Sequence, residues 1–336
     1  MSELPPALRA AIDRALQGRP QTALAERAAR TSEAYRAGAG SAAVIGDADD
    51  ALAYALARMP ATYAACRAAF AAAAERAPGF VPRRLLDVGC GPGTASWAAL
   101  ETWPKVEAVA WRDASPFFLD IAAEFAATGP EPLRGAESRR ADISTNVEFS
   151  PADLVLASYV LAEIAGERQA AVVAQLWAAC EGVLALVEPG TPAGYGRLLA
   201  ARTQLIAAGA QVLAPCPHPA DCPLTAPDWC HFSVRLPRSR AHRLAKGAQL
   251  PFEDEKFAYL VVARPGVAAE PARARVLAQP RAGKPGIALK LCVAEGLERR
   301  FIARRDKAAH ARARRLGWGD AYDDDALIGE PDAQEP

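Results

Sequence analysis

The sequence predicts an α/β protein built on a doubly wound, mainly parallel sheet. Three observations indicate this fold class. From residue 83 onward, short apolar runs alternate with helical segments, as in strands joined by crossover helices. A glycine-rich turn follows the first of these runs, and basic residues gather behind residue 230. The expected parts are a helical N-terminal region at 1–80, the sheet domain at 81–268 with an inserted cysteine-rich loop at 214–233, a small basic β-containing module at 269–318 and an acidic, disordered tail at 319–336.

Composition narrows the class of protein further. The chain has 336 residues, enough for more than one folded unit. No run of 18 apolar residues lacks charge, so we expect no membrane span. Glu3 and Asp13 lie in an N-terminus without the apolar stretch of a secretory signal. We therefore expect a cytoplasmic protein, monomeric by default, whose cysteines are reduced.

The first region reads as helices. Residues 4–18 have proline near the start and Gly18 at the end, the usual asymmetry of helix termini. Residues 23–35 and 51–76 are predicted to form two more, the second interrupted at Pro60. Nothing here carries chemistry, and a lid over a cofactor and an RNA-facing cap are both open interpretations.

Residues 84–100 read as a strand, a glycine-rich turn and a helix. Gly89, Gly91 and Gly93 allow close approach of a ligand, and the helix that follows offers free N–H groups to an anion. The dinucleotide pattern G-x-G-x-x-G is broken by Ser96. The run LLDVGCG resembles motif I of class I methyltransferases instead. That resemblance implies S-adenosylmethionine as cofactor, with Asp87 beside its methionine part.

The ends of later strands agree with this resemblance. Asp113 ends the second predicted strand, where an acid can accept both ribose hydroxyls. Asp142 follows the third strand, where the methyltransferase family reads the adenine amino group. Strand four and its loop are expected at 152–164, and strand five begins at 182 and ends at 188–190. Ser158 completes the predicted cofactor contacts. Helix capping is the structural alternative for both acids.

No catalytic residue is assigned. Amino-methyltransferases of this class usually carry [N/D/S]-P-P-[Y/F] after strand four to hold a flipped base, whereas here the run is Ala157-SYVLAE. Ser158, Tyr159 and Glu163 are the only candidates in that loop. A nucleophilic cysteine beside proline exists at Cys216 and Cys222, but both lie outside the sheet. Whether the chain transfers methyl groups is therefore open.

Four cysteines form the predicted metal site. Cys216, Cys222 and Cys230 follow the spacing C-x5-C-x7-C, and 61 residues separate Cys230 from Cys292. This is neither a radical S-adenosylmethionine motif nor the paired C-x2-C of zinc ribbons. Four thiolates could hold a [4Fe–4S] cluster, and zinc is the alternative, with His218 or His231 in place of one cysteine. The other three cysteines, Cys66, Cys90 and Cys180, are expected to be structural.

The same region carries a specific resemblance. The runs APCPH, CPL, DWCHF and EDEKFAY between residues 214 and 259 are similar to the signature of the mitochondrial small-ribosomal-subunit assembly methyltransferase-like family and its bacterial relatives. The similarity extends over about residues 80–320. It implies a role on small-subunit rRNA during assembly and an iron–sulfur cluster on the four cysteines.

Charge supports a nucleic-acid partner. Residues 231–316 hold 20 Lys and Arg against 7 Asp and Glu. The candidates for phosphate contact directly follow the cysteine loop: Arg235, Arg238, Arg240, Arg243 and Lys246. We expect an rRNA-binding assembly factor whose metal clamps the basic module to the sheet domain. An active rRNA methyltransferase is the alternative, and a small-molecule methyltransferase is disfavoured because small substrates need no basic module.

Overall fold

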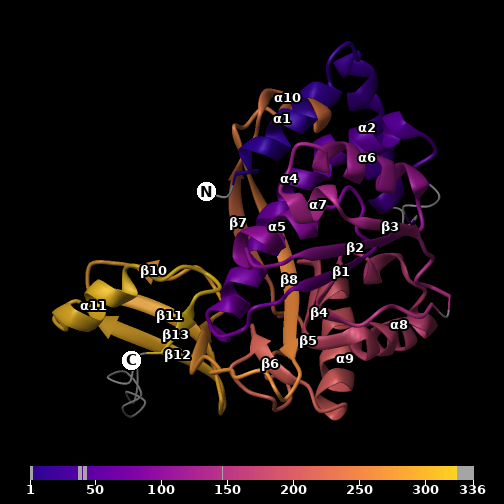
Figure 1. Ribbon diagram of the computed structural model, residues 1–336. Helices are drawn as coiled ribbons and strands as arrows, with labels where there is room; N and C mark the ends of the chain where they lie inside the picture. Colours follow the sequence, from indigo (N-terminus) through magenta and orange to yellow (C-terminus); the bar gives the residue numbers. More distant parts are fainter. Residues whose placement is uncertain (1–2, 37–39, 41–43, 146, 324–336) are drawn as a thin grey trace.

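Two sheets organise the molecule in the computed structural model, which describes residues 3–36, 40, 44–145 and 147–323. The larger sheet lies in the main domain, and the smaller one lies in a module that projects from its side (Figure 1). Among the described residues, no helix is long and apolar enough to cross a membrane.

The main sheet is mixed and mainly parallel, as the sequence predicts. Its strands are β1 (Arg84–Val88), β2 (Ala108–Asp113), β3 (Glu137–Arg140), β4 (Ala152–Ser158), β5 (Cys180–Pro189), β6 (Gln211–Ala214), β7 (Phe232–Pro237) and β8 (Phe252–Ala263). They lie in the order β3-β2-β1-β4-β5-β8-β6, and β7 also pairs with β8. The first five strands run parallel, and β8 is antiparallel to its neighbours. The carboxyl ends of β1 to β4 therefore meet at one edge.

Helices cover both faces of this sheet, which makes it doubly wound. One face packs against α4 (Ala48–Ala74), α5 (Thr94–Thr102) and α6 (Pro116–Ala126), and the other against α8 (Gly166–Ala179) and α9 (Pro192–Ala207). Strand β5 shows why: Val183, Ala185 and Val187 enter one core, while Leu184 and Leu186 enter the other. A strand buried on both faces needs such a continuous apolar run. The short α7 (Glu131–Arg134) and the 3-10 turn η1 (Leu161–Glu163) lie in loops.

The N-terminal region joins the main domain through α4. This helix is continuous, so the predicted interruption at Pro60 is wrong. Met59 and Ala61 on either side of the proline are fully buried. Packing of an apolar helix against the sheet outweighs the local cost of the lost N–H. The remaining helices, α1 (Pro6–Ala15), α2 (Gln21–Arg36) and α10 (Arg240–Ala245), gather at the same end of the molecule (Figure 1).

The module is a five-stranded sheet covered by one helix. It consists of β9 (Ala274–Val276), β10 (Arg281–Ala282), β11 (Gly286–Val293), β12 (Gly296–Ala303), α11 (Lys307–Ala313) and β13 (Ala321–Tyr322). The predicted strands at 286–294 and 297–304 and the basic final helix are confirmed. The expected disordered tail begins too early, because β13 pairs with β9. The rest of that tail, 324–336, lies outside the described residues.

Candidate functional site

The glycine turn lies at the carboxyl end of β1, with all three glycines in the left-handed region. Gly89, Gly91 and Gly93 have φ of 67°, 51° and 75°. A Cβ on Gly89 would come 2.4 Å from Cγ2 of Val160, whereas one on Gly91 would meet no atom within 4 Å. The turn is therefore closed against the β4 loop at Gly89 and open at Gly91. This leaves a glycine-lined space such as a cofactor's carboxylate requires.

Asp87, the last acid of β1, has one carboxylate oxygen without a partner. Its Oδ2 accepts hydrogen bonds from the Ser96 hydroxyl at 2.7 Å and the Ser96 N–H at 3.1 Å. Its Oδ1 is buried and has no hydrogen-bond partner among the described residues. Burial raises the pKa of Asp87 to about 7, and the nearby charge of Asp113 adds to the increase against the Ser96 bonds. A buried carboxylate with a free oxygen is suited to a cationic ligand group.

The other predicted cofactor residues follow the neighbouring strands. The Asp113 carboxylate accepts from the N–H groups of Gly91 and Ser115, each at 2.8 Å, and so ties the glycine turn to β2. Burial raises its pKa to about 6. Asp142 is exposed after β3 and caps Ser144, while the Ser158 hydroxyl after β4 lies 3.4 Å from the Cys66 sulfur. The topology thus brings Asp87, Asp113, Asp142 and Ser158 to one edge of the sheet.

The loop after β4 is held by a polar network that the sequence does not indicate. Tyr159 has φ of 63°, the one described non-glycine residue with positive φ. Its hydroxyl donates to Glu255 on β8 at 3.2 Å, and Arg58 on α4 lies 3.6 Å from the same carboxylate. Helix α4 therefore reaches the cofactor edge, and Tyr159 is committed to a structural hydrogen bond.

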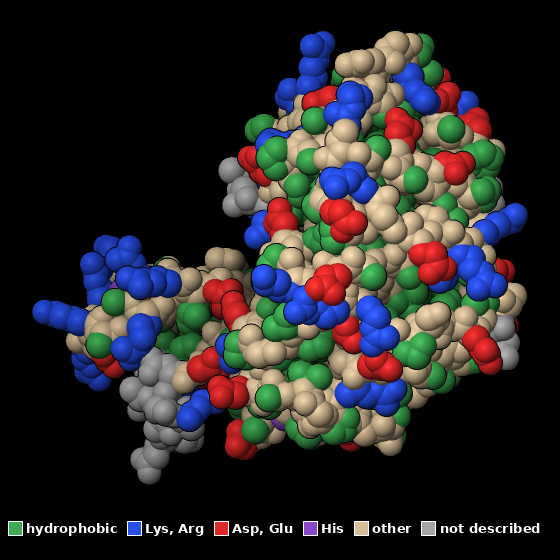
Figure 2. All heavy atoms as spheres, viewed as in Figure 1, with side chains coloured by type: hydrophobic (Ala, Val, Ile, Leu, Met, Phe, Trp, Pro, Cys, Tyr) green, Lys and Arg blue, Asp and Glu red, His purple; other side chains and the backbone are tan. Residues whose placement is uncertain are grey.

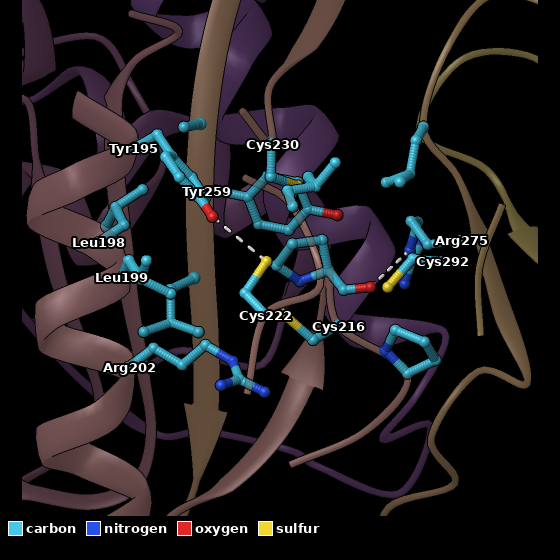
Figure 3. Close-up of a pocket in the computed structure, with 16 residues that line it drawn as sticks. Tyr195, Leu198, Leu199, Arg202, Cys216, Cys222, Cys230, Tyr259, Arg275 and Cys292 are labelled. Carbon is cyan, nitrogen blue, oxygen red and sulfur yellow. Dashed lines mark hydrogen bonds between the residues drawn. The ribbon is translucent and has the colours of Figure 1, made fainter. Parts of the chain in front are cut away.

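The four predicted metal ligands line one small cavity. Cys216, Cys222 and Cys230 come from the loop between β6 and β7, and Cys292 comes from β11 of the module (Figure 3). The cavity thus lies where the module meets the main domain. Its remaining walls are mostly apolar, from α9, β8 and the loop itself.

Three of the thiols in this cavity, those of Cys216, Cys230 and Cys292, have raised pKa values. Burial raises the pKa of Cys230 well above its ordinary value, and the other three sulfurs raise it further. Burial likewise raises the pKa of Cys292 to about 12 and increases that of Cys216. Among the described residues, no three side chains of His, Cys, Asp or Glu stand close enough to hold one metal ion. The cysteines share a cavity but do not form a closed single-ion site.

Two buried arginines face the same cavity, and sequence reasoning missed both. Arg202 on α9 donates to the carbonyls of His218 and Ala220, at 2.8 and 2.7 Å. Arg275 on β9 is only 1% exposed and donates to the carbonyls of Pro215 and Gly319. Neither forms an ion pair with a described residue, and each keeps one buried nitrogen without a partner, Nε in Arg202 and Nη2 in Arg275. Buried cations require an anion nearby.

Tyr195 and the two histidines complete the surroundings of the cysteines. The Tyr195 hydroxyl lies 3.2 Å from the Cys222 sulfur (Figure 3). His218 Nε2 lies 3.5 Å from the Cys292 sulfur, so His218 remains near the cavity. His231 stacks on Trp229 at 4.7 Å between ring centroids and contacts Trp318 edge-on. His231 therefore has a packing role in this arrangement.

Most of the predicted RNA-contacting residues have acidic partners in the structure. Arg235 forms two hydrogen bonds of 2.7 Å with Asp254 across the β7–β8 pair. Arg238 donates to Glu253 at 3.1 Å, and Lys246 pairs with the same carboxylate. These ion pairs hold β7 and α10 to β8.

The remaining two predicted cations differ from these. Arg240 is exposed and forms no ion pair within the described part of the chain, and Arg243 is half-buried with its Nε unpartnered. Both belong to α10, which packs on α2 and α4, away from the module. The module has its own exposed cations, gathered around α11 and the neighbouring strands (Figure 2): Arg281, Lys284, Arg299, Arg304, Arg305, Lys307, Arg314 and Arg315.

Curated relatives are ribosome assembly and mitochondrial proteins. The human protein described as "Ribosome assembly protein METTL17, mitochondrial" is 29% identical over 290 residues, 80% of this chain and 61% of the relative. The Schizosaccharomyces pombe "Rsm22-cox11 tandem protein 2, mitochondrial" is 24% identical over 294 residues, 71% of this chain and 38% of the relative. The chain thus spans less than two thirds of these relatives.

Solved methyltransferases share part of the fold. The magnesium protoporphyrin IX methyltransferase of Synechocystis is 15% identical with a TM-score of 0.36, over 56% of this chain and 72% of that one. The precorrin-6y C5,15-methyltransferase of Geobacter metallireducens is 15% identical with a TM-score of 0.37, over 58% and 86%.

A family model covers nearly the whole described chain. It is described as "Mitochondrial small ribosomal subunit Rsm22" and matches residues 48–323, from the start of α4 to the end of the module. This match includes the glycine turn, the cysteine loop and Cys292. The chain belongs to the Rsm22 family.

Proposed function

We propose that the chain is a small-ribosomal-subunit assembly factor that binds S-adenosylmethionine and rRNA and holds a metal centre on its four cysteines. The observation that carries this proposal is the placement of Cys292 opposite Cys216, Cys222 and Cys230 at the junction of the two sheets. Membership of the Rsm22 family and the name of the human relative support the ribosomal role. The exposed cations of the module supply charge for rRNA.

The sheet edge supports the cofactor. The free Oδ1 of Asp87 would accept the ammonium group of S-adenosylmethionine, and the open side of Gly91 would receive its carboxylate. Asp113 would bind the ribose hydroxyls, since its oxygens accept from the N–H groups of Gly91 and Ser115 and retain further lone pairs. Asp142 and Ser158 are proposed to border the adenosine part.

The two buried arginines support an anionic metal centre between the cysteines. Four thiolates around Zn²⁺, or around an oxidised [4Fe–4S] cluster, carry a net dianionic charge, which would match Arg202 and Arg275. A single zinc ion holds its sulfurs about 3.8 Å apart, as tetrahedral bonds of about 2.3 Å require. A four-iron cluster binds each cysteine to a different iron and so accepts wider spacing. The four cysteines line one cavity and would supply the thiolates of either centre.

The β4 loop favours binding over catalysis. Its Tyr159 is tied to Glu255, and its Val160 packs against Gly89, so neither is free to hold a base. We propose that the cofactor and the metal stabilise a conformation that binds rRNA. Methyl transfer to rRNA is the alternative that experiment must decide.

Purified protein tests these assignments together. Anaerobic protein should show the visible absorption of an iron–sulfur cluster with equal iron and sulfide, bind S-adenosylmethionine, and sediment with immature small-subunit particles. Labelled S-adenosylmethionine should leave no label in the rRNA. Label that disappears in an Asp87→Ala variant would establish the enzyme instead, and colourless protein with one zinc would refute the cluster.

Affinity for S-adenosylmethionine should rise with pH between about 5.5 and 7.5. Asp87 is protonated in the free protein below its pKa of about 7, and only the carboxylate pairs with an ammonium group. Because one proton is released from Asp87 on binding, the affinity can change by at most about tenfold per pH unit. Burial raises the pKa of Asp87 in the folded state above its value in the unfolded chain. The free protein should therefore lose stability as the pH rises from about 4 through 7. Calorimetry across this range should show both trends.

Asp87→Asn is the matched control, since it keeps the Ser96 contact and removes the titration. Its affinity should be weak, with only the smaller dependence below about pH 6 that Asp113 contributes. An unchanged slope up to pH 7.5 in this variant would contradict the assignment of Asp87.

A further inference from the structure

One face of the module's sheet is covered and the other is open. Ile287, Leu289 and Leu291 of β11 point to the face that packs against α11. The alternate residues of the same strands point the opposite way. Near β9 that opposite face carries Cys292 and Arg275 and closes the cysteine cavity. Its exposed residues form what we call the open sheet face: Arg281, Ala288, Leu297, Arg299 and Phe301. Leu297 lies opposite Cys292, and Phe301 lies opposite Ala288 at the other end of the hairpin.

An aromatic ring lies on this face. Phe301 is 54% exposed and Leu297 is 46% exposed, two of the few large apolar side chains so placed among the described residues. The register puts Arg281, Ala288 and Phe301 in one cross-strand row. The Phe301 ring reaches over Gly286, where a Cβ would come 2.7 Å from its Cζ. The ring is thus seated on backbone, with its other side toward solvent.

Arginine side chains flank the ring. Arg281 and Arg299 are both exposed on this face, whereas Lys290, which lies opposite Arg299, pairs with Asp228 of the cysteine loop. The only acid in β10, β11 or β12 is Glu298, which lies opposite Leu291 on the covered face and pairs with Arg300. An exposed ring flanked by guanidinium groups is how sheets bind unpaired bases, by stacking on the ring and charge on the backbone.

We propose that the open sheet face binds a single-stranded segment of RNA, with one unpaired base stacked on Phe301 and its phosphates beside Arg281 and Arg299. This rests on the proposed rRNA-binding function and names the surface and the structural class of RNA. Paired RNA does not fit, because its bases already stack on one another and are not offered to a flat face.

Fluorescence anisotropy with a short unstructured oligoribonucleotide, and with the same sequence as a duplex, tests the proposal. The full chain with its metal should bind the single strand more tightly than the duplex. Phe301→Ala should weaken single-strand binding about tenfold and leave the salt dependence unchanged. Arg299→Gln should lower the slope of log affinity against log salt by about 0.7. Leu250→Ala removes an equally exposed apolar side chain from the main domain and should change nothing.

Two further variants separate stacking from a merely apolar contact. Phe301→Trp should retain affinity, whereas Phe301→Leu should bind as weakly as Phe301→Ala. Full binding by Phe301→Leu would refute stacking and point to a protein partner. A wild-type chain that binds no RNA would defeat the rRNA part of the proposed function. If the wild-type chain and the Phe301→Ala variant bound the single strand with equal affinity, this inference alone would be refuted.

Discussion

Cys292→Ser is expected to lose the metal and to release the module from the main domain. Cys292 is the only one of the four cysteines on the second sheet, so the metal would be the strongest link between the two units. Other links also cross the junction: Arg275 donates to the Pro215 carbonyl, Trp318 contacts the His231 ring, and Lys290–Asp228 and Arg76–Asp323 form partly exposed ion pairs. Exposed pairs of this kind contribute about 1 kcal/mol or less.

A metal that binds only the folded junction stabilises it by mass action, about 4 kcal/mol when present at a thousand times its dissociation constant. Cys292→Ser should lose this contribution of the metal to the stability of the junction. Limited proteolysis should then cut between β8 and β9, and hydrogen exchange should increase in β11. Affinity for rRNA should fall with the loss of a fixed module.

Cys180→Ser is the matched control, because Cys180 is a buried thiol in β5 outside the cavity. It should lower stability through its own burial while metal content and the proteolytic pattern stay those of the wild type. If Cys292→Ser kept its metal, or lost it without exposing the β8–β9 connection, the clamp would be refuted.

Local patterns were sufficient to predict that Asp87, Gly91 and Asp113 lie together at one edge of the main sheet. Asp87, Gly91 and Asp113 each follow a short apolar run that forms a parallel strand, and parallel strands end at one edge. The strand, the glycine turn and the helix follow one another directly in the sequence, so no contact between distant segments had to be predicted. The module strands at 286–293 and 296–303 were predictable for the same reason, since they form one hairpin.

Contacts between distant segments could not be predicted. Arg202 and Arg275 occur in stretches with other arginines, and only the packing of α9 and β9 against the cysteine loop buries them. Arg235 was expected to face RNA, but the antiparallel register of β7 and β8 sets it opposite Asp254. A register between strands 15 residues apart or more is decided by the core, not by the local sequence.

Arg275→Met should have opposite effects on stability with and without the metal. In the loaded protein Arg275 offsets the charge of the metal centre, and its removal leaves a buried anion that is only half compensated. Breaking one side of a buried pair costs about 3–5 kcal/mol. In a Cys222→Ser/Cys292→Ser background, the same arginine is a buried cation that forms no ion pair of 4 Å or less with a described residue and keeps one nitrogen without a hydrogen bond. Replacing it there should be neutral or stabilising, by up to about 4 kcal/mol.

The comparison of the two backgrounds isolates the charge, because the bonds from Arg275 to the carbonyls of Pro215 and Gly319 are lost equally in both. Arg264→Met is the control: Arg264 also donates to backbone carbonyls, but it is partly exposed, stacks on Trp177 and does not line the cavity of the four cysteines. In denaturant unfolding, Arg264→Met should lower the free energy of unfolding by the same amount in both backgrounds. If Arg275→Met behaved like this control, the cavity would hold no anionic centre, and its two buried arginines would need another explanation than charge.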